Sequence, residues 1–64
     1  MMPMPMERKE FVEHIPDPEC MFEVVEVLDD DKVRCRPFSA RAWMRHVGNP
    51  VFDRRDLRTV ELFR

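Results

Sequence analysis

A cluster of arginines in the second half of the chain is the feature best suited to chemistry. The guanidinium group is planar, stays charged at physiological pH, and offers a fork of donors that matches phosphate or carboxylate oxygens. Nearby aromatic rings add surfaces on which a base could stack. If exposed on adjoining elements, these groups would contact RNA; if folded against the acidic first half or a neighbouring subunit, they would only form ion pairs. The candidate site residues are Arg34, Arg36, Phe38, Arg41, Arg45 and His46.

Charge is distributed unevenly along the chain. The 64 residues carry 11 basic and 13 acidic side chains, a formal net charge of -2. Residues 1–31 hold two basic and ten acidic side chains, whereas residues 32–64 hold nine basic and three acidic ones, so the two halves have net charges of -8 and +6. Most of the basic residues are arginine. Arginine suits anion recognition, but an excess of arginine is also what a GC-rich genome produces. Composition alone therefore identifies no partner.

Three strands are predicted in the first part of the chain. Residues 9–15 are rich in β-branched and aromatic side chains and are followed by a turn that Pro16 and Pro18 enforce. Residues 20–28 and 32–38 are predicted to form a hairpin, because a run of three aspartates between them supplies a polar reversal.

The two arms of this hairpin differ in how regularly they alternate. The second arm alternates cleanly between an apolar and a basic face. The first arm does so only if a bulge near Val24 and Val25 moves the later residues into the other register. In the second arm, Val33, Cys35 and Pro37 share one face, and Lys32, Arg34 and Arg36 share the other.

A short helix is predicted between Ser39, a good N-cap, and Gly48, a good C-terminal cap. Its apolar residues recur at the spacing of one helical face. We expect this apolar stripe to place Trp43 in the core and to leave Arg41 and Arg45 one turn apart on the exposed side. The stripe consists of Ala40, Trp43, Met44 and Val47.

The remaining segments complete a small, mainly β domain. Residues 58–63 are predicted to form the last strand, after a turn or single helical turn capped by Asp53. The order of elements predicts a small OB-like barrel, or alternatively an SH3-like barrel, of four to five antiparallel strands with one short helix between strands 3 and 4. Residues 1–8 are predicted to be a flexible N-terminal arm, and residues 9–64 a single barrel domain.

The sequence offers little for catalysis or metal binding. It has one glycine, no tyrosine and no glycine-rich phosphate loop, and Ser39 is better used as a helix cap. The histidines and cysteines lack the paired spacings of zinc sites. Two cysteines without a signal peptide indicate reduced, buried thiols, and no apolar run is long enough to cross a membrane. We therefore expect a non-enzymatic cytoplasmic protein with no cofactor and no membrane partner.

Three segments resemble parts of bacterial translation initiation factor one. They are residues 12–24 (VEHIPDPECMFEV), 39–47 (SARAWMRHV) and 55–62 (RDLRTVEL). The resemblance implies an OB-fold that associates with RNA or the ribosome. It also implies that Arg41 takes the place of the family's lysine and that His46 stands near the family's tyrosine.

The chain also departs from that family. Ala40 and Arg55 replace two of the family's glycines, and the usual fifth strand is missing because the sequence stops at Arg64. We therefore expect an open barrel edge that the N-terminal arm or a second copy would cover. The acidic first half also departs from the net positive surface that favours ribosomal RNA binding.

Two functions follow from these observations. The first is RNA binding through the arginine cluster, with phosphates as the main contacts. The second is a protein-protein interaction or regulatory module with no nucleic-acid role, which binds a charged protein partner or forms a homodimer.

Overall fold

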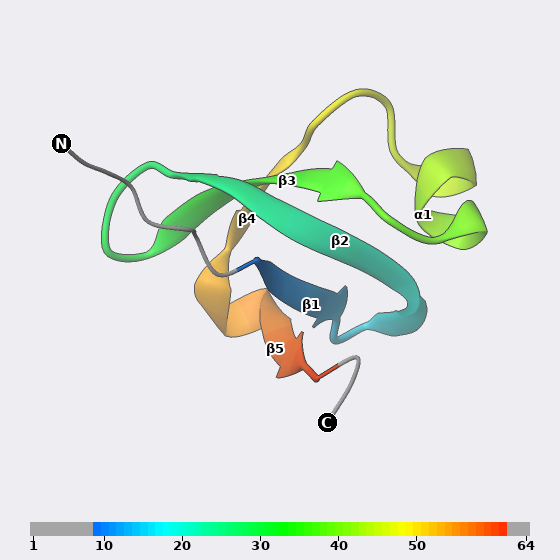
Figure 1. Cartoon of the computed structure of the whole chain (residues 1–64), viewed down its shortest axis with the longest axis horizontal. Helices are drawn as coiled ribbons and strands as arrows, with labels where there is room; N and C mark the ends of the chain where they lie inside the picture. The colour runs from blue at the N-terminus through cyan, green and yellow to red at the C-terminus, as the bar shows by residue number, and fades with distance from the viewer. Residues whose placement is uncertain (1–8, 62–64) are drawn as a thin grey trace, which may run out of the picture.

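The structure is a computed structural model that describes residues 9–61. The predicted arm, residues 1–8, lies outside the described residues, as does the end of the strand predicted over residues 58–63. Strands dominate, and one short helix lies at an end of the sheet (Figure 1). The elements are β1 (Glu10–His14), β2 (Asp17–Val27), β3 (Lys32–Pro37), α1 (Ala40–Arg45), β4 (Val51–Asp53), the 3-10 turn η1 (Arg54–Asp56) and β5 (Leu57–Val60).

All five strands form one antiparallel sheet that curls into a half-barrel (Figure 1). The strand order is β4-β3-β2-β1-β5, so the last strand returns to pair with the first. This confirms the mainly β fold with one short helix between strands 3 and 4. The expectation of a missing fifth strand was wrong, because β4 lies in the connector after the helix. Strand β4 has three residues, which are too few to show the alternation of a strand in the sequence.

The long strand β2 makes the curl of the sheet. Residues 17–24 of β2 pair with β1, and residues 22–27 pair with β3. Phe22 lies where the two pairings overlap, opposite both Val12 and Pro37. The β2–β3 register shifts between Val24 and Glu26, where the bulge was predicted. A bulge bends its strand and increases the local twist, which lets β2 serve two neighbours.

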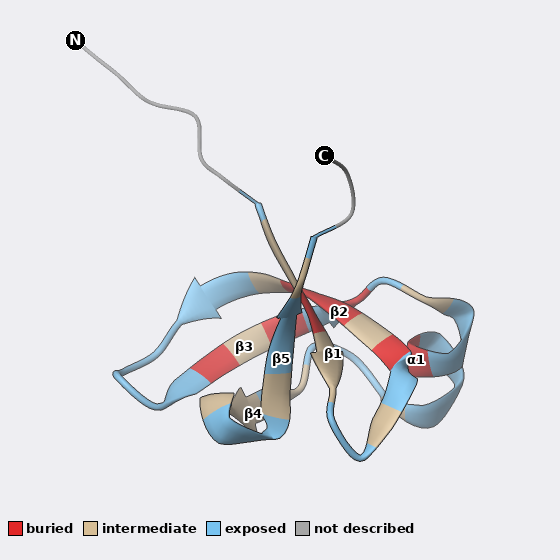
Figure 2. Cartoon of the chain, turned by 90° about the horizontal axis from the view of Figure 1, so that it is seen from below, coloured by how far each residue is buried: buried red, intermediate tan, exposed pale blue. Residues whose placement is uncertain are grey.

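The core lies on the inner face of the sheet and is small. The alternation predicted for β3 is confirmed, since Val33, Cys35 and Pro37 are buried. Both cysteines are free and buried, and burial raises the pKa of the Cys35 thiol to about 11. Buried residues occur along β2 and β3 and in α1 (Figure 2). The fully buried hydrophobic residues are Val12, Cys20, Phe22, Val33, Cys35 and Ala42.

The helix turns the opposite face to the sheet from the one predicted. Trp43 and Met44 are 64% and 83% exposed, and the buried residue is the small Ala42. The helix also ends at Arg45, so Val47 lies beyond it and is 96% exposed. The predicted apolar stripe is therefore not part of the core. Ala42 takes its place against the sheet, while Arg41 and Arg45 beside it are exposed, as predicted.

This packing predicts very different effects on stability for two aromatic substitutions. Phe22→Ala should cost about 3–5 kcal/mol, because the side chain is fully buried. The hydrophobic core of a domain this small contributes about the same free energy to folding. The Phe22→Ala variant should therefore not unfold cooperatively. Trp43→Ala should change the free energy of unfolding by less than about 0.5 kcal/mol, as exposed substitutions do. Urea denaturation followed by circular dichroism measures both, and a comparable loss in the two variants would contradict the orientation of α1.

Candidate interaction site

The two candidate arginines of β3 lie on the outer face of the sheet, opposite acidic residues of β2. Arg34 pairs with Glu26 across the ladder, and its Nε lies 3.1 Å from Glu26 Oε1. Arg36 lies opposite Glu23, and its guanidinium donates to the Glu23 carboxylate. Glu23 is largely buried, and the hydrogen bond from Arg36 lowers the pKa of its carboxyl. Both arginines therefore serve as cross-strand partners.

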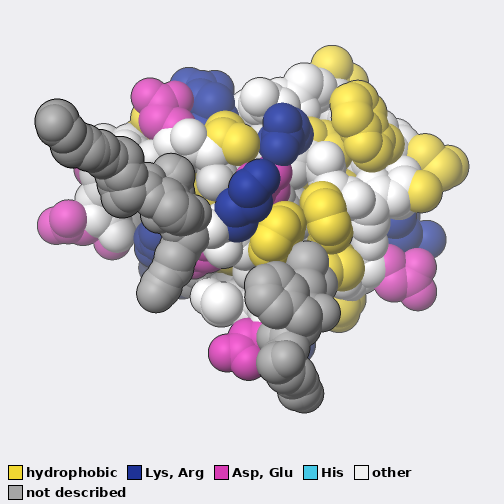
Figure 3. Space-filling model, in the orientation of Figure 1, with side chains coloured by type: hydrophobic (Ala, Val, Ile, Leu, Met, Phe, Trp, Pro, Cys, Tyr) yellow, Lys and Arg dark blue, Asp and Glu magenta, His cyan; other side chains and the backbone are white. Residues whose placement is uncertain are grey.

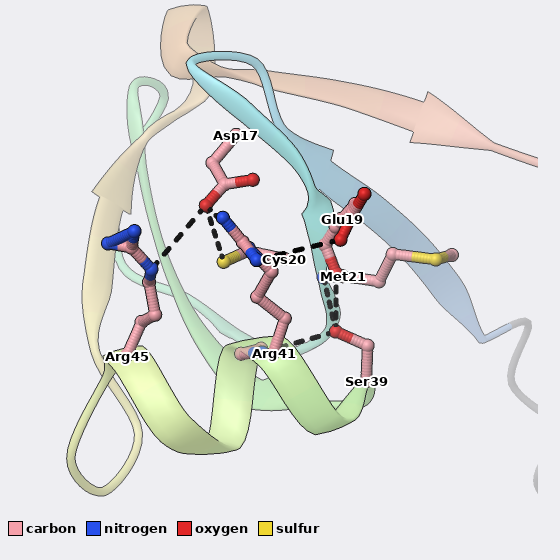
Figure 4. Close-up of polar contacts among 8 residues, drawn as sticks. Asp17, Glu19, Cys20, Met21, Ser39, Arg41 and Arg45 are labelled. Carbon is pink, nitrogen blue, oxygen red and sulfur yellow. Dashed lines mark hydrogen bonds and ion pairs between the residues drawn. The ribbon is translucent and has the colours of Figure 1, made fainter.

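The two candidate arginines of α1 share one carboxylate on β2. Arg41 Nε donates to Asp17 Oδ2 at 3.0 Å, and Arg45 Nε lies 3.6 Å from the same oxygen (Figure 4). The Arg41 hydrogen bond holds the pKa of Asp17 below its ordinary value, and Asp17 in turn raises the pKa of Arg41. The thiol of Cys20 also donates to Asp17, at 3.5 Å. Asp17 thus fixes the arginine-bearing face of the helix against the start of β2.

Ser39 anchors the beginning of the same helix. Its hydroxyl accepts from the Ala42 amide at 3.2 Å, which confirms the predicted N-cap. The hydroxyl also donates to the Glu19 carbonyl at 2.7 Å and accepts from the Met21 amide at 3.0 Å (Figure 4). One side chain therefore caps the start of the helix and ties it to β2.

The two aromatic candidates lie in different surroundings. Phe38 is 49% exposed and its ring packs on Phe11, with centroids 4.8 Å apart. His46 is half-buried among other rings, with its centroid 5.2 Å from Phe22 and 5.5 Å from Phe52. His46 therefore helps to pack the end of the half-barrel, and of the two only Phe38 is exposed enough for stacking on a base.

Ion pairing extends to all the basic side chains that the structure describes. Arg8 and Arg64 fall outside residues 9–61, and each of the other nine basic residues has a nitrogen within 3.7 Å of a carboxylate oxygen. The arginine cluster is therefore neutralised by the chain's own acids. A phosphate would have to compete with these carboxylates for each guanidinium.

A hydrophobic surface at the helix end of the molecule was missed by the sequence analysis. Trp43, Met44 and Val47 project from α1 and the segment after it, and we call these three residues the docking surface. Hydrophobic side chains gather on this side of the molecule (Figure 3). The one sequence signal for this orientation is the small Ala42 between two arginines, because a helix approaches a sheet most closely over a small residue.

The described residues contain no group of three histidine, cysteine or acidic side chains placed to hold a metal ion. None of the helices in this part of the chain is both long and apolar enough to span a bilayer. Comparisons with protein-family models, curated proteins and solved structures give no significant match. The resemblance to the initiation-factor family therefore stays a prediction.

The paired carboxylates predict how stability depends on pH. The pKa values of Asp17 and Glu23 are lower in the folded chain than their ordinary values. The stabilisation they give is present above the unfolded-state pKa and is lost as the pH falls through the lower folded-state values. The free energy of unfolding should therefore decrease below about pH 4.5.

Urea denaturation at a series of pH values tests this in a double variant, Asp17→Asn with Glu23→Gln. At pH 7 the variant should be less stable than the wild type, and it should lose less on acidification. Asp30→Asn, on the exposed tip of the β2–β3 hairpin, is the control and should follow the wild type. An unchanged acid dependence in the double variant would contradict the role given to these carboxylates.

Proposed function

We propose that the protein is a small non-enzymatic interaction module that binds a protein partner through the docking surface. The observation that carries this proposal is the exposure of Trp43, Met44 and Val47, which are 64%, 83% and 96% exposed. Tryptophan and methionine are enriched at protein-protein interfaces, and tryptophan is among the residues that contribute most to binding energy. Contiguous exposed apolar side chains on a small domain are typical of such sites.

The docking surface is also held in place before a partner arrives. Ser39 fixes the start of α1, and Asp17 binds two arginines of the same helix. Ala42 packs against the core on the face between these contacts. A rigid helix loses little conformational freedom on binding, which favours affinity. The fold thus presents an apolar face on a firmly anchored element.

The ion pairs give the rival function, RNA binding, less support. Its expected contacts are the guanidiniums of the arginine cluster, and Arg34, Arg36, Arg41 and Arg45 each pair with a carboxylate of β2. Exchange of a carboxylate for a phosphate at these positions yields little net gain of Coulomb energy. RNA association therefore stays a prediction, and so does the cytoplasmic location.

The strand order supports the proposal at the level of fold. We infer that the SH3-like plan describes the half-barrel better than the OB-like plan. Strands β1 to β4 pair in chain order, as in a meander, and not in the Greek-key order of the OB plan. Here β5 follows η1 and pairs with β1, while β4 pairs with β3.

Site-specific photo-crosslinking in cells tests the proposal. A photoreactive residue in place of Met44 should form a covalent adduct with a polypeptide, because this side chain is 83% exposed on the docking surface. The same residue in place of Val27 is the matched control, since Val27 is 63% exposed at the other end of β2. Position 27 should give at least tenfold less adduct.

Either of two results would contradict the proposal. One is an adduct yield at position 44 no higher than at position 27. The other is salt-sensitive binding to RNA that is lost when Arg41 and Arg45 are replaced by alanine, which would support the rival function.

A further inference from the structure

The size of the docking surface bears on what can cover it. An aromatic side chain offers up to about 250 Å² and the other two residues somewhat less, so at their observed exposures the three present on the order of 450 Å². Two such surfaces in contact would bury on the order of 900 Å² in total, close to the roughly 1,000 Å² at which specific interfaces begin. A second copy of the same surface therefore gives an interface at the low end of the range, as expected for a weak or transient dimer.

The charges beside the docking surface are compatible with contact between copies. Arg41 and Arg45 of α1 are paired with Asp17, and Arg41 also lies 3.7 Å from Glu19. Two positive and two negative groups thus compensate one another within each copy. A two-fold contact over α1 would bring together locally neutral surfaces, which avoids the cost of like charges meeting.

The small core gives a reason for the fold to gain from association. Within residues 9–61, six hydrophobic side chains are fully buried, and both thiols are free. Domains of this size are commonly reinforced by disulfides, structural metals or oligomerisation. The part of the chain described here contains neither a disulfide nor a cluster of metal-ligating residues. Association through the docking surface, where apolar side chains are most exposed, would add buried apolar area to this small core.

We propose that a second copy of this chain occupies the docking surface and forms a two-fold dimer. In an isologous contact, Trp43 of one copy would pack against Met44 of the other, a pairing of aromatic ring and thioether that is favourable. Val47 of each copy would flank this contact. The small area predicts a weak dimer. This inference rests on the proposed function, because it names the partner of the same surface.

Sedimentation velocity from about 1 µM to about 500 µM, with the fluorescence of Trp43 as a second measurement, tests the dimer. Trp43 is the single tryptophan of the chain, so its emission reports on this surface alone. The wild type should pass from one to two chains as concentration rises, with a shift of emission to shorter wavelength. Met44→Glu should weaken association at least tenfold, because the two-fold contact would bury two carboxylates.

Val27→Glu is the matched control, since it adds the same charge to another exposed apolar position. It should associate as the wild type does, and circular dichroism should show all three proteins folded. A wild type that stays a single chain throughout, or a Met44→Glu variant that associates as tightly, overturns the dimer. If the single-chain wild type still forms an adduct with a different protein at position 44, the proposed function stands; without any adduct, both fail.

Discussion

Ion pairing between the acidic first half and the basic second half is the interaction on which the rest of the structure depends. Seven of the ten ion pairs in residues 9–61 join a carboxylate before the Asp29–Asp31 turn to a basic residue after it. Three of them lie directly opposite in the ladders: Glu23 with Arg36, Glu26 with Arg34, and Glu13 with Arg58. Each is worth little alone, but a one-residue slip in register would break them and move the apolar residues to the other face. The charge asymmetry of the sequence is thus largely used in folding.

These ion pairs also determine which side chains of α1 are exposed on the surface. Asp17 draws Arg41 and Arg45 toward the sheet, and Ala42 between them packs in the core. The opposite side of α1 then turns to solvent with Trp43 and Met44. Cations that would attract nucleic acid are engaged within the chain, while apolar side chains that would close a core are exposed. This exposed apolar surface is the one that we propose for a protein partner.

Apart from β4, the sequence predicted the elements because their signals are local. Strict alternation in β3, the bulge at Val24, the hairpin around Asp29–Asp31 and the Ser39 cap each depend on a few consecutive residues. The orientation of α1 could not be predicted in this way. Helical spacing tells which residues share a face, and both faces of this helix are plausible inner faces. The choice depends on Asp17, which is 24 positions from Arg41 in the chain. The partners of the other arginines are likewise set by tertiary pairing.

The most direct test of the central role of the ion pairs is a charge exchange between Glu13 and Arg58. These residues lie opposite each other in β1 and β5, and Arg58 Nη2 is 2.7 Å from Glu13 Oε2. Urea denaturation should show that Glu13→Arg and Arg58→Glu each destabilise the fold, and that the double variant recovers most of the loss. The coupling free energy should be about 0.5–1 kcal/mol and should shrink as salt is added. Additive losses with no recovery, at low salt as at high salt, would contradict the account.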